Sequence, residues 1–162
     1  MKSVRIEGLA DPCEVATNHR LLDVLVDRGV PLVMACGGKG LCATCHVHVV
    51  AGAQGLSPRT PREQRSLQML ADSRADSRLA CQAKVTGAGV QVALPRGRYL
   101  IATTDLEALI GRRAEEPILH PVDGRQLIAP GKIITRTRIT ELASVDVDVA
   151  ELRTRSLSIL RR

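Results

Sequence analysis

Four of the five cysteines have a spacing that narrows what this chain can fold into. Cys36, Cys42 and Cys45 form a C-x5-C-x2-C run, and Cys81 follows after 35 intervening residues. Zinc fingers and ribbons normally present two short ligand pairs that face each other. A loop of three thiols closed by a distant fourth suits a [2Fe-2S] cluster better. Zinc held by the same four thiolates remains the alternative.

The residues between the clustered cysteines fit a loop that wraps a metal group. Gly37, Gly38 and Gly40 have no Cβ, so their amide groups can point toward sulfur atoms. Amide dipoles directed at a cluster stabilise added negative charge and raise its reduction potential. We therefore expect these three glycines to be part of the binding site.

Three further loop residues are candidates for the same site. A cation near the metal group favours its reduced state, and Lys39 is the cation within the loop. Simple solvation of this lysine is the alternative. Leu41 and Ala43 are expected to shield one side of the group.

The remaining cysteine and two neighbouring histidines are expected to be structural. Cys13 lies in a predicted strand, where packing in the core is favoured over redox sensing. His46 and His48 share one face of a strand, but the second pair of loops that a Rieske centre requires is missing. Local hydrogen bonding is the expected role of both histidines.

Composition excludes several classes of protein. Hydrophobic residues make up 44% and charged residues 25% of the 162 residues, which is typical of a folded globular chain. No apolar run approaches the roughly 20 residues of a membrane span, and the N-terminus lacks a signal-peptide core. We expect a cytoplasmic protein with no membrane association. With one Tyr, no Phe and no Trp, nucleic-acid binding by base stacking is not expected.

The segments around the cysteines resemble a known family. The stretch ACGGKGLCATCHVHV, followed by LSPRTPREQRSLQML and RLACQAKV, is similar to [2Fe-2S] ferredoxins of the β-grasp fold. Its spacing resembles the iron–sulfur-assembly type, and its CGGKG and RLACQ segments resemble ferredoxin domains fused to bacterial adenylate cyclases. The resemblance covers residues 3–95 and implies four cluster ligands: Cys36, Cys42, Cys45 and Cys81.

Local patterning agrees with an α+β, β-grasp ferredoxin domain over residues 1–95. Two strands, a helix, the cysteine loop, a strand, a second helix and two further strands are expected in that order. The first helix is predicted to begin with Asn18 as its cap, and the second to begin at the capping-box segment Thr60–Glu63. The expected ranges are 4–17 for the hairpin, 18–28 and 60–72 for the helices, and 47–50, 79–85 and 90–94 for the other strands.

The rest of the chain is not needed for that domain. Residues 96–117 are interpreted as a linker with a possible short helix. Residues 118–162 are predicted to form a small β(α)β module, with a hairpin turning at Asp123-Gly124, helical turns over 137–143 and a strand over 145–152. Because such a module has a thin core, we expect it to serve docking or homo-oligomer formation.

The resemblance implies a one-electron carrier, not an enzyme, that exchanges electrons with a reductase and an acceptor protein. A redox-sensing regulatory module is the alternative, and a zinc-stabilised interaction domain is the less favoured one. Ferredoxins of the assembly type usually dock through an acidic helix. Here residues 1–95 carry 11 basic and 8 acidic side chains, a net charge of +3. The partner-binding surface is therefore expected to differ from the family's usual one.

Overall fold

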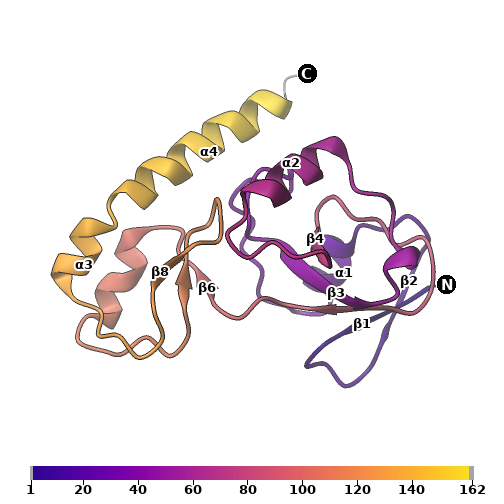
Figure 1. The fold of residues 1–162 in the computed structure, drawn as a ribbon, viewed down its shortest axis with the longest axis horizontal. Coiled ribbons are helices and arrows are strands. Elements are labelled where there is room, and N and C mark those ends of the chain that lie inside the picture. The colour runs from indigo at the N-terminus through magenta and orange to yellow at the C-terminus, as the bar shows by residue number, and fades with distance from the viewer. Residues whose placement is uncertain (1, 161–162) are drawn as a thin grey trace.

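The computed structural model describes residues 2–160 and contains two units, each with its own buried core (Figure 1). The N-terminal unit holds the cysteine loop, and the C-terminal unit lies beside it. The predicted domain boundaries also include Met1, Arg161 and Arg162, which lie outside the described residues.

The N-terminal unit is a five-stranded mixed sheet with two helices. The strand order is β2-β1-β5-β3-β4, in which β1 and β5 are parallel and the other neighbours are antiparallel. The strands are β1 Lys2–Ile6, β2 Cys13–Val15, β3 His46–Ala51, β4 Ser77–Leu79 and β5 Val90–Ala93; the helices are α1 Leu21–Asp27, α2 Pro61–Met69 and the short η1 Ala53–Gly55. This confirms the predicted α+β, β-grasp fold.

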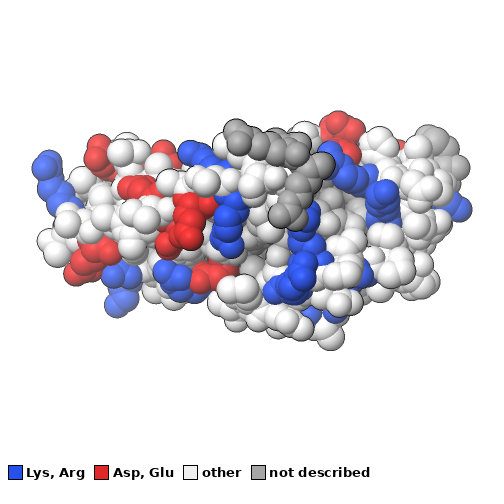
Figure 2. All heavy atoms as spheres, turned by 90° about the horizontal axis from the view of Figure 1, so that it is seen from above, with Lys and Arg blue, Asp and Glu red and all other residues white. Residues whose placement is uncertain are grey.

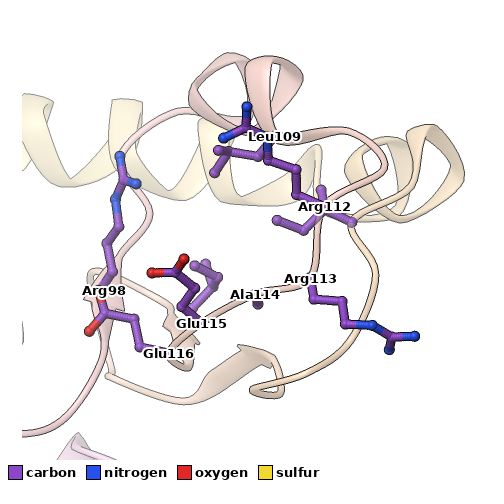
Figure 3. Close-up of a pocket in the computed structure, with 9 residues that line it drawn as sticks. Arg98, Leu109, Arg112, Arg113, Ala114, Glu115 and Glu116 are labelled. Atoms are coloured by element: carbon purple, nitrogen blue, oxygen red, sulfur yellow. The ribbon is translucent and has the colours of Figure 1, made fainter.

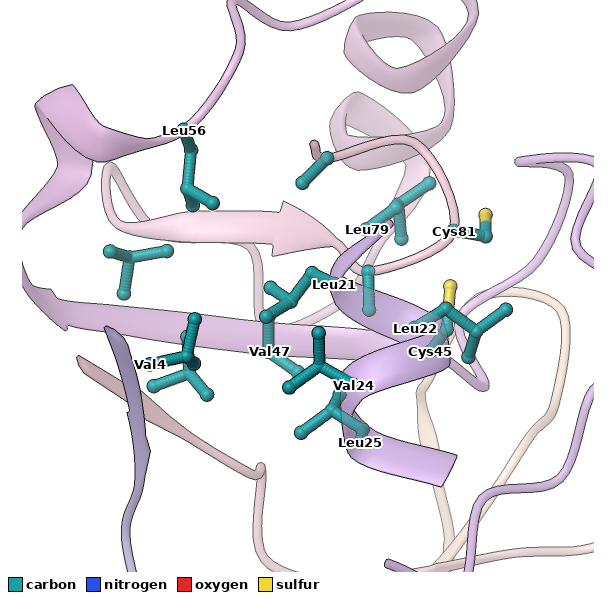
Figure 4. Close-up of a cluster of buried hydrophobic side chains, with 14 of the residues drawn as sticks. Val4, Leu21, Leu22, Val24, Leu25, Cys45, Val47, Leu56, Leu79 and Cys81 are labelled. Carbon is teal, nitrogen blue, oxygen red and sulfur yellow. The ribbon is translucent and has the colours of Figure 1, made fainter. Parts of the chain in front are cut away.

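The core of this unit forms where α1 covers the sheet. Leu21, Leu22 and Leu25 of α1 are buried against strand residues such as Val4 and Val47 (Figure 4). Burying a side chain of this size contributes about 1.5–3 kcal/mol. The face of α1 that carries these leucines therefore holds this helix on the sheet.

The two predicted helix starts had different outcomes. Thr60 caps α2 as expected, because its hydroxyl accepts a hydrogen bond from the Glu63 amide at 3.1 Å and Pro61 opens the helix. The prediction that Asn18 caps α1 is wrong. Asn18 has a left-handed backbone with φ of 68° and its amide donates to Val85 O, so the helix begins at Leu21.

The predicted strand over 79–85 is also wrong beyond its first residue. After Leu79 the chain turns, and the amides of Gln82 and Ala83 both donate to the Leu79 carbonyl at 2.9 and 3.1 Å. Lys84 and Val85 then make only isolated bridges to other segments. The turn places Cys81 at the end of the sheet rather than within it.

A buried ion pair joins α2 to β4. Glu63 is 0% exposed, and its carboxylate accepts hydrogen bonds from the Arg78 guanidinium at 2.7 and 3.1 Å and from the Leu79 amide at 2.9 Å. The capping-box pattern suggested that Glu63 serves only its own helix. Its side chain instead connects the helix to the strand that precedes Cys81.

The C-terminal unit contains a three-stranded sheet and two helices. Its strand order is β6-β7-β8, with β6 parallel and β8 antiparallel to β7, and the hairpin turns near Asp123-Gly124 as predicted. Its elements are β6 Arg98–Tyr99, η2 Thr103–Leu109, β7 Ile118–Leu119, β8 Gln126–Ile128, α3 Arg136–Glu141 and α4 Ser144–Leu160. Both β6 and η2 fall within residues 96–117, so that segment contributes structure to this unit.

The predicted strand over 145–152 is wrong, because these residues belong to α4. Val145, Val149 and Leu152 are buried at helical spacing, whereas Val147 is 66% exposed. Asp146 accepts hydrogen bonds from the amide and hydroxyl of Thr103. The unit is thus a hairpin followed by helices rather than a β(α)β module. None of the helices in residues 2–160 has the length and apolar content needed to cross a membrane.

The buried pair yields a stability prediction. Replacing Glu63 by Leu leaves the Arg78 charge buried without its partner, so we expect the free energy of unfolding to fall by about 3–5 kcal/mol. Glu141→Leu is the control, since its pair with Arg138 is exposed and contributes at most about 1 kcal/mol. Urea unfolding followed by circular dichroism measures both. Equal losses in the two variants would contradict the assigned role of Glu63.

Candidate metal centre

The four cysteines selected by spacing come from two segments that the fold brings together. Cys36, Cys42 and Cys45 lie in the loop between α1 and β3, and Cys81 lies in the turn after β4. All four are buried. Figure 4 shows Cys45 and Cys81 at the same end of the hydrophobic core. The candidate centre therefore lies where the sheet ends and the long loop begins.

The thiols are arranged as two pairs. Cys36 and Cys42 influence the pKa of one another, and so do Cys45 and Cys81, which places the thiols as two neighbouring pairs. Within residues 2–160, no group of three or more His, Cys, Asp or Glu side chains is arranged to hold one metal ion. A structural zinc ion needs four ligands around a single atom. Two neighbouring pairs of thiols could each supply two ligands to one atom of a two-iron group.

One thiol of each pair is the more readily deprotonated. The hydrogen bond from Cys42 lowers the pKa of Cys36 to about 5, although burial opposes this, and the amides of Leu41, Lys39 and Gly38 add to it. The pKa of Cys81 is lowered by Cys45, by the Gln82 side chain and by the Gly40 amide. The thiolate is the metal-binding form of cysteine. The loop thus presents N–H donors to sulfur atoms that carry negative charge.

The loop glycines adopt a backbone that favours glycine. Gly38 and Gly40 have φ angles of +78° and +73°, and a Cβ at Gly40 would lie 2.8 Å from the Gln82 side chain. The amide of Gly37 does not face a thiol: it donates to Met34 O at 3.1 Å. In this loop the amides of Gly38, Lys39 and Leu41 lie beside Cys36, and the amide of Gly40 lies beside Cys81.

The C-terminal unit also contacts this loop, which sequence reasoning missed. The Ser156 hydroxyl of α4 donates to the Cys36 carbonyl at 2.5 Å. Leu152, one turn earlier, is 0% exposed and packs with Cys36 and Cys42. The amide of Ala43 donates to Pro121 O at 2.9 Å. The helical spacing of Val145, Val149 and Leu152 is the signal that could have revealed this buried face.

His120 fixes the segment that supplies Pro121. It is buried, and its Nε2 lies 2.8 Å from an Asp148 carboxylate oxygen of α4, while its Nδ1 accepts the Val122 amide at 3.1 Å. These contacts join the turn of the hairpin to α4. The histidine therefore acts on the candidate centre only by holding its surroundings.

The other predicted structural residues are where they were expected. His46 pairs with Ser77 Oγ at 2.8 Å and His48 with Asp76 Oδ1 at 3.0 Å, which confirms local hydrogen bonding. Burial lowers the pKa of His46 to about 4, with a smaller effect of His48, so the ring is neutral near pH 7. Cys13 is buried in the main core, as predicted.

A separate hollow in the C-terminal unit differs in chemistry. Figure 3 shows it between η2 and the second sheet, with a volume of about 260 Å³. Arg98, Arg112 and Arg113 line it together with Glu115 and Glu116, above an apolar floor. Neither cysteine nor histidine lines this hollow. The cysteine site is accordingly the candidate functional centre.

The contact of α4 with the cysteine loop predicts a stability difference within one helix. Leu152→Ala leaves a cavity against Cys36 and Cys42, so we expect the free energy of unfolding to fall by about 2–5 kcal/mol. Leu157→Ala is the matched control, because Leu157 is 60% exposed and we expect a change within about 0.5 kcal/mol. Chemical unfolding of both variants provides the measurement. A similar small effect for both would mean that α4 does not hold the loop.

Comparison with known proteins gives a consistent result. The family described as "2Fe-2S iron-sulfur cluster binding domain" matches residues 4–86. The chain is 31% identical over 96 residues to 2Fe-2S ferredoxin-5 of Aquifex aeolicus, an alignment that covers 59% of this chain and all of that protein.

Two solved structures are similar to the N-terminal unit. One is the ISC-like [2Fe-2S] ferredoxin of Pseudomonas putida, with a TM-score of 0.55, 27% identity and coverage of 59% of this chain and 93% of that one. The other is putidaredoxin in its covalent complex with putidaredoxin reductase, with a TM-score of 0.50, 30% identity and coverage of 58% and 98%. In both cases the similarity covers somewhat more than half of the present chain.

Proposed function

Because this chain belongs to the [2Fe-2S] ferredoxin family, we propose that it is a one-electron carrier whose cluster is held by two pairs of cysteines. The proposed ligands are Cys36 with Cys42 on one side and Cys45 with Cys81 on the other. The observation that carries this proposal is the arrangement of four buried thiols as two pairs.

The residues around the thiols perform two tasks in this proposal. When bound, the cluster supplies reversible uptake of a single electron. The amides of Gly38, Lys39 and Leu41 at one pair, and of Gly40 at the other, are already oriented toward sulfur. Such fixed dipoles stabilise added negative charge without reorganisation. Leu152 covers the first pair with apolar surface and excludes water from it.

The proposal contains no substrate chemistry. The hydroxyl nearest Cys42 belongs to Thr44, lies 3.1 Å from the thiol and also accepts the Ala35 amide. The Ser156 hydroxyl is engaged by a backbone carbonyl. Glu63 is held by Arg78. These groups are occupied with structural contacts, which supports a carrier rather than an enzyme.

We propose a reductase and an acceptor protein as partners, by analogy with putidaredoxin and its reductase. Self-association through the C-terminal unit is not part of the proposal. The apolar face that motivated it is covered within the same chain, since Leu152 packs on the cysteine loop. Neither redox sensing nor a zinc-stabilised domain gains support from a particular contact among residues 2–160.

The ligand assignment predicts a difference between two cysteine variants. Cys81→Ser replaces a soft thiolate by a hydroxyl, so we expect little or no stable native cluster in that variant. Cys13→Ser changes a core residue away from the site and is expected to keep a full cluster. Iron content and the visible spectrum measure both. A native spectrum in Cys81→Ser would refute the assignment.

The carrier function itself is tested by redox titration of the full chain. We expect a red-brown protein that takes up one electron per cluster and gives an electron paramagnetic resonance signal only when reduced. A colourless zinc protein with no such signal would overturn the proposal.

Truncation after Pro95 tests the role of the C-terminal unit. The sheet ends at Ala93, so we expect the remaining residues to fold and to bind a cluster. Because the contacts of Leu152, Ser156 and Pro121 are lost, we expect the truncated protein to lose its cluster several-fold faster in air. The decay of visible absorbance measures this rate. An unchanged rate would show that the C-terminal unit does not protect the site.

A further inference from the structure

Only part of the cysteine loop reaches the surface. Gly37 is exposed and Gly38, Lys39 and Leu41 are half-buried, whereas residues 42–45 are buried. The buried part lies beneath the C-terminal unit, which contacts it through Pro121. Electron exchange requires close approach of the partner. If the centre carries electrons as proposed above, the partner must reach it from the side of residues 37–39.

Basic side chains from several elements surround residues 37–39, which form the opening to the thiols. Lys39 lies within it, and the Arg62 guanidinium of α2 donates to the Lys39 carbonyl at 3.3 Å. On the α1 side, Arg20 Nη1 lies 3.6 Å from the position that a Cβ of Gly38 would occupy. We call Lys39, Arg62 and Arg20 the basic rim.

Most of the charge on the basic rim is not neutralised by the protein. Arg20 forms an ion pair with Asp23 at 2.9 Å. In the described part of the chain, the ion pairs include no acidic partner for Lys39 or Arg62. In the view of Figure 2, from above the orientation of Figure 1, basic side chains predominate over the N-terminal unit. The opening to the thiols therefore has a positive surface.

We propose that the basic rim is the docking surface for a redox protein that presents acidic side chains. Complementary charges accelerate encounter and orient the partner. On this chain such orientation brings the partner over the exposed loop residues 37–39. This inference rests on the proposed carrier function. A nucleic acid offers the same charge, but a rim placed around the opening to four thiols serves electron exchange.

Binding of an acidic probe tests the rim apart from electron transfer. The probe is a fluorescent polyglutamate peptide, titrated with the full-length cluster-bearing protein and followed by anisotropy. We expect binding at low salt that is lost at high salt, and about tenfold weaker binding by the double variant Lys39→Gln, Arg62→Gln. The control is the double variant Arg5→Gln, Lys132→Gln, which removes two charges outside the rim. We expect it to keep most of the affinity.

Electron transfer to small oxidants provides the second readout. The measured quantity is the ratio of two oxidation rates of the reduced protein, by ferricyanide, an anion, and by hexaamminecobalt(III), a cation. We expect this ratio to be higher at low than at high ionic strength in the wild-type protein. In the rim variant, the ratio at low ionic strength is expected to be lower by about threefold or more. The control variant is expected to retain the wild-type ratio.

Several results would overturn the proposal. Equal weakening of polyglutamate binding in the rim and control variants means that only net charge matters. Stronger binding of a duplex DNA fragment than of polyglutamate at the same rim means that the surface serves nucleic acid. A shifted reduction potential with unchanged binding means that the rim only compensates the charge of the centre. Absence of the visible spectrum in wild-type protein refutes the carrier function instead, so the two failures are distinguishable.

Discussion

The structure depends on holding an irregular loop in place from outside. Residues 36–45 contain neither helix nor strand, so their backbone groups cannot satisfy one another in a regular ladder. Two helices, α2 and α4, supply the missing partners. Ser66 and Arg62 of α2 donate to the carbonyls of Gly40 and Lys39, and Ser156 of α4 donates to Cys36 O. Without these contacts, the sulfur-facing amides would have no fixed direction.

The helix α2 links both halves of the thiol site. One face of it contacts the cysteine loop through Ser66. Its buried Glu63 holds Arg78 and the Leu79 amide of β4, two residues before Cys81. The position of Cys81 relative to the loop is therefore set through one helix. The cost of desolvation limits how much a buried ion pair adds to stability. This pair still fixes the position of α2 relative to β4.

The sequence predicts the N-terminal unit well, because its information is local. The run Cys36, Cys42 and Cys45 and the cap at Thr60 can each be recognised within a short window, and Cys81 is recognised from the segment RLACQ around it. Their order along the chain is sufficient to predict the β-grasp arrangement. The two errors in this unit, at Asn18 and after Leu79, lie where a hydrogen bond to a distant segment or a tight turn overrides local propensity.

The C-terminal unit was harder to predict for a physical reason. Alternating Val and Asp over 145–149 fits a strand with one polar face. In the structure both aspartates serve as partners of distant groups, Asp146 for Thr103 and Asp148 for His120. Because the segment is a helix, Val145 and Val149 are buried on one face and Val147 is exposed on another. Such partners come from residues 28 to 43 positions away, so no local pattern could reveal them.

The same long-range contacts give the centre two unequal sides. On one side, Leu152 packs on the loop and Pro121 accepts a backbone hydrogen bond from Ala43, so the C-terminal unit covers this side. On the other side, Gly37 and Gly38 have no side chain to block approach, and basic groups surround them. In the proposed carrier, the second unit would thus determine the direction from which electrons enter and leave, without contributing one of the proposed ligands.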